Sequence, residues 1–129
     1  MIYFSGIKQQ KKLASEVYDW FCEQRNIGDV DITVHSCDLT DDNVFAWCEQ
    51  EDDEFIISIH STLSVRDYIV TLIHELIHVS QSLCGLFDDT LREKEAYELE
   101  YELASQFLLD VPLVELSQTF TKRIKTCHT

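Results

Sequence analysis

The segment His74-Glu75-Leu76-Ile77-His78 has the pattern H-E-x-x-H. On a helix, two histidines four residues apart lie on one face, so both imidazoles can reach a single tetrahedral ion. A zinc ion held in this way lowers the pKa of water from 15.7 to about 7. Glu75 is placed to take a proton from that water. The pattern therefore predicts a zinc (Zn2+) site with His74 and His78 as metal ligands and Glu75 as the catalytic base.

The flanking sequence predicts the helix that this chemistry requires. Ser64 followed by Asp67 is typical of a helix start, and Gly85 supplies a stop. Between them runs an apolar stripe at helical spacing: Ile69, Leu72, Ile73, Leu76, Ile77, Leu83 and Cys84. At about 100° per residue, His74 and His78 fall on the side opposite this stripe. We therefore expect both histidines to line a cleft instead of packing in the core.

A catalytic zinc ion needs a third protein ligand and one open position. After His78 the only histidine is His128, in the C-terminal tail, and Cys84 lies on the apolar stripe. The next predicted helix, from Leu91 to Leu109, instead carries five glutamates: Glu93, Glu95, Glu98, Glu100 and Glu102. The third ligand is therefore expected to be a carboxylate of this helix.

Helical position separates the five glutamates. Glu93 and Glu100 fall inside a broad apolar band, whereas the other three share the opposite side. The band consists of Ala96, Leu99, Leu103, Ala104 and Phe107, with Tyr97, Tyr101 and Leu108 at its edge. A carboxylate in an apolar face needs a cation or a hydrogen-bond partner, because burying it alone is costly. Glu93 is the predicted metal ligand, Glu95 the alternative, and Glu100 the predicted partner of a ligand.

The H-E-L-I-H segment followed by Arg92-Glu93-Lys94-Glu95-Ala96-Tyr97 resembles the gluzincin-type zincins. In these HExxH metallopeptidases a glutamate on a following helix completes the zinc site. Glu93, Ala96 and Tyr97 match the family's glutamate, small residue and histidine-orienting residue, although Tyr97 replaces the usual Asp or Asn. The same segments are similar to small phage-type and prokaryotic metallopeptidases, over about Phe55 to Pro112.

The resemblance implies a zincin-like fold and hydrolysis of peptide bonds in a peptide or protein substrate. Glu75 would accept a proton from water and pass it to the leaving amine. The strand before the active-site helix, Phe55 to Ile59, would pair with the substrate backbone. Tyr97 or Tyr101 is expected either to stabilise the oxyanion or to pack in the core. The Gln81 amide is expected either to contact a ligand histidine or to face solvent.

Three other interpretations stay open. A non-catalytic zinc-binding interaction domain of the same fold fits the motif equally, because a small chain has little room for substrate subsites. A SprT-like repair protease is disfavoured for two reasons. It uses a third histidine, and no suitably placed one follows His78; it also needs a basic surface, whereas this chain is acidic. A structural protein with a fortuitous motif would bind no metal.

The other elements predict an α+β fold in a single domain over residues 1–129. An N-terminal helix includes Leu13 to Gln24 and stops at Asn26-Ile27-Gly28. Three strand-like runs follow and predict a small antiparallel sheet, with a hairpin between the last two: Asp31–His35, Val44–Cys48 and Phe55–His60.

The last part of the chain predicts further helix. Thr90 with Glu93 predicts the start of the second site helix, and Asp110-Val111-Pro112 predicts its end. A short amphipathic segment from Leu113 to Ile124 is expected to follow.

Composition excludes some partners. The formal net charge is -14, and the stretch from Asp38 to Glu54 holds eight acids and no Lys or Arg. Such a field repels phosphate backbones, so we expect no nucleic-acid partner. No apolar run approaches a membrane span or a signal peptide, so no membrane association is expected. Five cysteines without C-x-x-C spacing favour reduced thiols and a cytoplasmic location.

Overall fold

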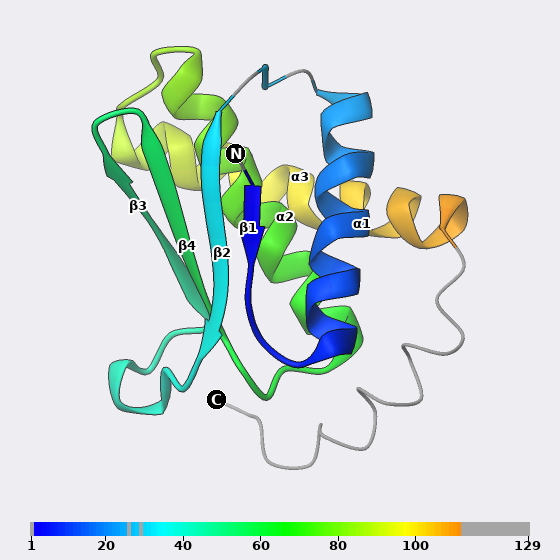
Figure 1. Cartoon of the computed structure of the whole chain (residues 1–129). Helices are drawn as coiled ribbons and strands as arrows, with labels where there is room; N and C mark the ends of the chain where they lie inside the picture. Colours follow the sequence, from blue (N-terminus) through cyan, green and yellow to red (C-terminus); the bar gives the residue numbers. More distant parts are fainter. Residues whose placement is uncertain (1, 26, 29, 112–129) are drawn as a thin grey trace.

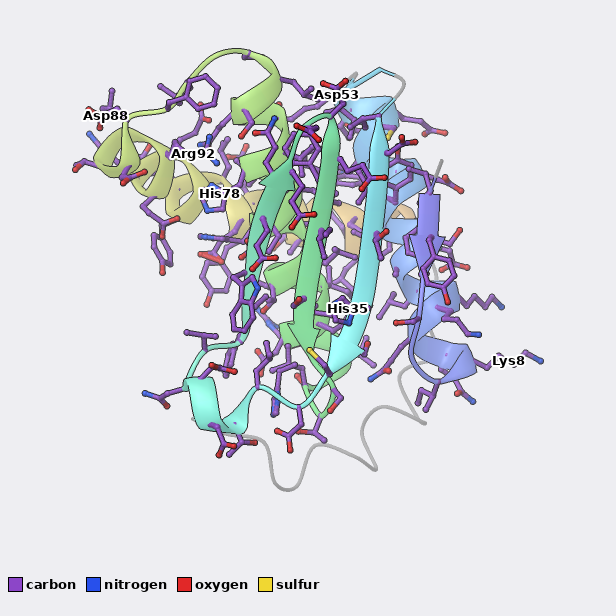
Figure 2. All side chains as sticks on the ribbon, turned by 60° about the vertical axis from the view of Figure 1, so that its left-hand side comes forward. Lys8, His35, Asp53, His78, Asp88 and Arg92 are labelled. Atoms are coloured by element: carbon purple, nitrogen blue, oxygen red, sulfur yellow. The ribbon has the colours of Figure 1, made fainter. Side chains whose placement is uncertain are left out.

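The computed structural model describes residues 2–25, 27–28 and 30–111 of the chain. Its elements follow the order β1 (Ile2–Phe4), α1 (Lys8–Gln24), β2 (Asp31–Cys37), the 3-10 turn η1 (Thr40–Asp42), β3 (Ala46–Glu51), β4 (Glu54–His60), α2 (Val65–Leu83) and α3 (Asp89–Asp110). The helices lie on one side of a four-stranded sheet (Figure 1, Figure 2). The α+β class predicted from the sequence is confirmed.

The sheet is mixed, and the prediction of an antiparallel sheet was wrong. The strand order is β1-β2-β4-β3, in which β1 pairs with β2 and β2 with β4 in parallel. Only β3 and β4 form the predicted antiparallel hairpin. Strand β1 was missed because it has three residues, too few to show an alternating pattern. Helix α1 supplies the crossover that parallel pairing of β1 and β2 requires.

Buried and more exposed side chains alternate along the two central strands, β2 and β4, and the buried set defines the core face of the sheet. Five apolar side chains on this face are at most 2% exposed: Ile32, Val34, Phe55, Ile57 and Ile59. They pack with the apolar sides of α1 and α2 in one continuous core. In addition, Trp20 Nε1 of α1 donates a hydrogen bond to Asp110 Oδ2 at the end of α3, over 2.8 Å. Truncating a core Leu or Ile to Ala is expected to cost about 2–5 kcal/mol.

Local signals set the ends of α2 as predicted. The Ser64 side chain accepts a hydrogen bond from the Asp67 backbone N–H over 3.0 Å. Gly85 has φ +82°, a conformation that glycine adopts without steric cost. The predicted apolar stripe is buried from Ile69 to Ile77, but Leu83 is 48% exposed and Cys84 is exposed as well. The last turn of α2 therefore extends beyond the core.

Helix α3 starts earlier than predicted. Asp88, not Thr90, caps it, since the Asp88 side chain accepts a hydrogen bond from the Leu91 N–H over 3.0 Å. The predicted end at Asp110 is confirmed. Ala96 is fully buried, and a small side chain at this point lets α3 lie close against α2.

Two further sequence expectations concern the whole chain. The cysteines in the described residues, Cys22, Cys37, Cys48 and Cys84, are free thiols. Among the same residues, no helix combines the length and the apolar character needed to cross a membrane. The predicted amphipathic segment from Leu113 to Ile124 lies outside the described residues, as does His128.

Candidate metal centre

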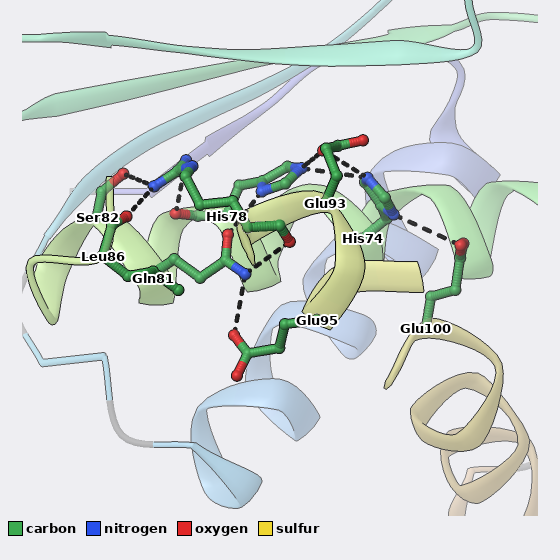
Figure 3. Close-up of polar contacts among 9 residues, drawn as sticks. His74, His78, Gln81, Ser82, Leu86, Glu93, Glu95 and Glu100 are labelled. Carbon is green, nitrogen blue, oxygen red and sulfur yellow. Dashed lines mark hydrogen bonds and ion pairs between the residues drawn. The ribbon is translucent and has the colours of Figure 1, made fainter. Parts of the chain in front are cut away.

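Two histidines of α2 and one glutamate of α3 converge on a single point (Figure 3). His74 Nε2 lies 3.1 Å from His78 Nε2. Glu93 Oε1 lies 2.6 Å from His78 Nε2 and 3.6 Å from His74 Nε2. These three atoms lie within 4.8 Å of one another. The structure thus brings together the three side chains that the sequence singled out as metal ligands.

The spacing of these atoms fits a shared metal ion. In a tetrahedral zinc site with bonds of about 2.0–2.1 Å, neighbouring ligand atoms are about 3.3 Å apart. The three observed separations run from 2.6 to 3.6 Å and bracket this value. Two imidazole nitrogens 3.1 Å apart cannot both present lone pairs unless a proton or a cation lies between them. Two imidazoles and one carboxylate also form a donor set that zinc prefers, with one position left open.

The other nitrogen of each imidazole faces a fixed polar partner. His78 Nδ1 lies 2.8 Å from Gln81 Oε1. Of the two positions expected for the Gln81 side chain, the structure therefore shows the one beside a histidine and not the one in solvent. His74 Nδ1 lies 3.6 Å from Glu100 Oε1. Glu100 is 6% exposed and therefore occupies the buried position beside a ligand that its place in the apolar band predicted.

The rival glutamates have other partners. Glu95 Oε1 accepts a hydrogen bond from Gln81 Nε2 over 2.9 Å and does not belong to the group of potential metal ligands. Glu98 pairs with Lys94 at 4.0 Å on the exposed side of α3. Glu102 is exposed as well. Glu93 is 49% exposed at its side chain, so it belongs to the rim of the site instead of the apolar interior in which the sequence placed it.

Arg92 was not singled out from the sequence, yet it joins the two site helices. Its Nη1 donates to Ser82 Oγ over 3.1 Å and to the Leu86 carbonyl over 2.8 Å. Its Nη2 donates to the His78 carbonyl over 3.4 Å. A positive charge at the C-terminal end of α2 also compensates the helix dipole. The sequence feature that could have drawn attention to Arg92 is its place as a lone arginine beside Glu93 in an acidic stretch.

The charge of the site comes mainly from carboxylates. Glu75 is 6% exposed, and burial, followed by the nearby Glu93 and Glu100 carboxylates, raises its pKa to about 8. Burial and then Glu93 raise the pKa of Glu100 to about 7. These values belong to the metal-free site. A bound cation favours the charged form of each carboxylate and thus opposes the shift.

Neutral imidazole is the form of histidine that binds metals. Burial lowers the pKa of His74, and the neighbouring His78 lowers it further, while Glu93 acts in the opposite direction. The site therefore favours the ligating form of His74.

The converging side chains open into a cavity of about 800 Å³ between α2, α3 and the start of β3. The lining residues come from these three places: 43–48 before and within β3; Thr71, His74, Glu75 and His78 of α2; and Asp89, Arg92, Glu93, Tyr97 and Glu100 of α3. The histidines thus face a cleft, as predicted. Figure 2 shows His78 and Arg92 on the side of the molecule away from Lys8 of α1.

The strand next to this cavity is β3 and not β4. Strand β4 is paired on both sides, with β2 and with β3, so the expectation that Phe55 to Ile59 is free to pair with a substrate was wrong. The Phe45 carbonyl accepts a hydrogen bond from the His60 N–H over 2.7 Å. In an antiparallel ladder the intervening residues, here Ala46, Cys48 and Gln50, then direct their backbone N–H and C=O groups away from β4.

The two tyrosines weighed as oxyanion donors differ in position. Tyr97 lines the cavity, and its ring centroid lies 4.9 Å from that of His74. Tyr101 does not line the cavity and is 61% exposed. Neither packs in the core, so the core interpretation of both tyrosines was wrong. Only Tyr97 lies on the cavity wall beside His74.

Comparison of the chain with protein-family models, with curated proteins and with solved structures finds no significant match. The geometry of the candidate metal centre and its cavity is therefore the basis for assigning a function.

Proposed function

We propose that the protein is a zinc-dependent metallopeptidase of the gluzincin type. One observation carries this proposal: the Nε2 atoms of His74 and His78 and Oε1 of Glu93 converge at 2.6 to 3.6 Å on the wall of a cavity that Glu75 also lines. A structural cluster of histidines has no need of an adjoining cavity or of a buried carboxylate facing it. A reduced, cytoplasmic setting belongs to the same proposal, as does a peptide or protein substrate.

His74, His78 and Glu93, which all line the cavity, would hold the zinc ion. When bound, zinc supplies Lewis acidity that lowers the pKa of a water molecule and polarises a carbonyl. Glu100 next to His74 Nδ1 and Gln81 next to His78 Nδ1 would hold the two rings in place.

Glu75 would act as the general base. It accepts a proton from the attacking water and then donates that proton to the leaving amine, so it ends the cycle in the state in which it began. Its burial keeps water from solvating the carboxylate, which strengthens its interaction with the reacting groups. The phenol of Tyr97, on the same cavity, is the proposed hydrogen-bond donor to the oxyanion.

The substrate would lie along β3. The outward N–H and C=O groups of Ala46 and Cys48 are free of β4 and adjoin the cavity, so an extended peptide can add to the sheet at this edge. Trp47 and Phe45 border the same cavity and offer apolar surface to substrate side chains.

The test compares the wild-type chain with Glu75→Gln. Both proteins are purified, their zinc content is measured, and their cleavage of a denatured protein substrate is followed with and without a chelator. We expect one zinc ion per chain in both proteins and a rate in the variant about 10²- to 10⁴-fold lower, because only the proton transfer is lost.

The other outcomes discriminate between the alternatives. Stoichiometric zinc without any Glu75-dependent cleavage would replace the peptidase by a zinc-binding interaction domain. Absence of bound zinc in the wild-type protein, with unchanged stability after chelation, would leave a structural protein with a fortuitous motif.

A further inference from the structure

We propose that Gln81 is a positioning residue that fixes the tautomer of His78, so that the Nε2 lone pair of this ring faces the metal. The inference rests on the proposed metal site but not on peptide hydrolysis. It is carried by the hydrogen bonds of a single buried amide (Figure 3).

The orientation of the Gln81 amide follows from its acceptors. Its Nε2 lies 2.9 Å from the backbone carbonyl oxygen of Arg92 and 2.9 Å from Glu95 Oε1. A backbone carbonyl only accepts hydrogen bonds, so the NH₂ group of Gln81 must be the end that faces it. Its Oε1 must then be the end that faces His78, and an amide oxygen only accepts. Gln81 is 3% exposed, so water does not compete for these bonds.

The amide thereby determines where the imidazole proton resides. His78 Nδ1 lies 2.8 Å from Gln81 Oε1 and must donate to it. A neutral imidazole carries one proton, so His78 Nε2 then presents its lone pair. This nitrogen is the one that lies 2.6 Å from Glu93 Oε1 and 3.1 Å from His74 Nε2. By holding a proton on Nδ1, Gln81 leaves Nε2 as the ring nitrogen that can bind a metal.

The same amide positions the third ligand. Arg92, whose carbonyl accepts from Gln81, immediately precedes Glu93 on α3. The hydrogen bond to Arg92 thus holds the first turns of α3 against α2 at the level of His78. Glu95 provides a second anchor on α3. One side chain therefore orients His78 and fixes the distance between the helices that carry the ligands.

The first experiment reads the tautomer directly. Nitrogen-15 NMR of the imidazoles in the metal-free wild-type protein is expected to show a proton on Nδ1 of His78. In Gln81→Met, which has no strong acceptor, His78 is expected to populate the Nε2–H form as well. A wild-type His78 without a proton on Nδ1 would overturn the proposal whether or not the protein hydrolyses peptides.

The second experiment measures affinity for zinc alone, by competition with a chromophoric chelator. Loss of a hydrogen-bond partner of a ligand histidine typically weakens metal binding about 10- to 100-fold, and this loss is expected for Gln81→Met. In the double variant Gln81→Glu with Glu95→Gln, the new carboxylate at position 81 can still accept from His78 Nδ1. The new amide at position 95 can donate to the same carboxylate. It loses the donor to the Arg92 carbonyl, so it is expected to recover only part of the affinity. Unchanged zinc affinity in Gln81→Met would contradict the proposal.

Folding is controlled separately, because Gln81 is buried. Glu95→Leu removes one anchor of the amide and leaves Gln81 itself in place, and it is expected to weaken zinc binding by less than Gln81→Met does. Glu102→Leu changes an exposed glutamate of the same helix and is expected to leave the affinity unchanged. Equal zinc affinities of Glu95→Leu and Glu102→Leu would show that the hydrogen bond between Gln81 and Glu95 does not support the site. Failure of the wild-type protein to bind zinc would refute the proposed function, whereas the tautomer of His78 would still be measured.

Discussion

His60 and His78 are equally buried, at 8% and 9% exposure, but their hydrogen bonds are opposite. At the end of β4, His60 Nδ1 accepts a hydrogen bond from the Leu39 N–H over 3.0 Å, and its Nε2 lies 2.9 Å from Thr62 Oγ1. Because Nδ1 of His60 accepts, its proton must be on Nε2 when the ring is neutral. In α2, the His78 Nδ1 faces an acceptor, and Nε2 faces His74 and Glu93.

The comparison teaches that burial alone does not distinguish a structural histidine from a candidate ligand. Both nitrogens of His60 meet groups that satisfy them, a backbone amide and a hydroxyl. The Nε2 atom of His78 instead meets another nitrogen and a carboxylate on the wall of a cavity. The partners of Nε2, and not the exposure of the ring, separate the two roles.

The largest difference is expected in zinc binding. His78→Ala removes one of three proposed ligands and should weaken zinc affinity by more than about 100-fold, beyond the loss typical of an outer partner. His60→Ala should leave the affinity unchanged, because His60 is not among the potential ligands. Chelator competition on both variants measures this. Similar losses in the two variants would break the distinction between the histidines.

A second contrast concerns the carboxylates. Glu93→Gln removes the charged group 2.6 Å from His78 Nε2 and is expected to lower zinc affinity by at least about 10-fold. Glu95→Gln preserves a carbonyl oxygen that can accept from Gln81 Nε2, so a change below about 3-fold is expected. Titration with zinc checks both variants. If Glu95→Gln lowered zinc affinity more than Glu93→Gln does, Glu95 would be the third ligand.

Metal removal should destabilise the fold through α2 and α3. At a free zinc concentration 100 times Kd, binding adds about 2.7 kcal/mol to the free energy of unfolding. Urea unfolding with zinc and with chelator measures the difference, which is expected to vanish in His78→Ala. Coincident unfolding curves in the wild-type protein would show that the cluster holds no metal.

The last contrast concerns the effect of His60→Ala on stability, which should not depend on zinc. This variant leaves the Leu39 N–H without its acceptor, and a buried donor left in this way costs about 1–3 kcal/mol. The same urea experiment should show this loss both with zinc and with chelator. A loss seen only in the presence of zinc would link His60 to the metal after all.

The site helices could be predicted because their signals are local. Ser64 and Gly85 mark the ends of α2, and helical phase places Glu93 and Glu100 toward the histidines. The same phase predicted Glu95 on the opposite, solvated side, and this was wrong, because Glu95 bonds to Gln81 of α2. A local signal also caused the error at the start of α3. Thr90 with Glu93 has the spacing of a capping box, but the Glu93 carboxylate turns to His78 and Asp88 caps the helix instead.

The sheet could not be predicted in the same way. Alternation along a strand has a period of two whether its neighbour runs parallel or antiparallel, so it does not reveal direction. Parallel pairing of β1 with β2 and of β2 with β4 depends on contacts between distant parts of the chain. The role of β3 as the edge strand beside the cavity followed only from the strand order.

The open edge of β3 also bears on self-association. Exposed strand edges invite pairing with a second copy of the same chain, and proteins discourage this with charged side chains. Glu49 and Glu51 lie exposed on β3, and Asp52, Asp53 and Glu54 continue the charge through the hairpin turn. Two copies that met edge to edge would bring these like charges together. The acidic hairpin thus discourages aggregation while leaving the strand accessible to a chain that lacks this charge.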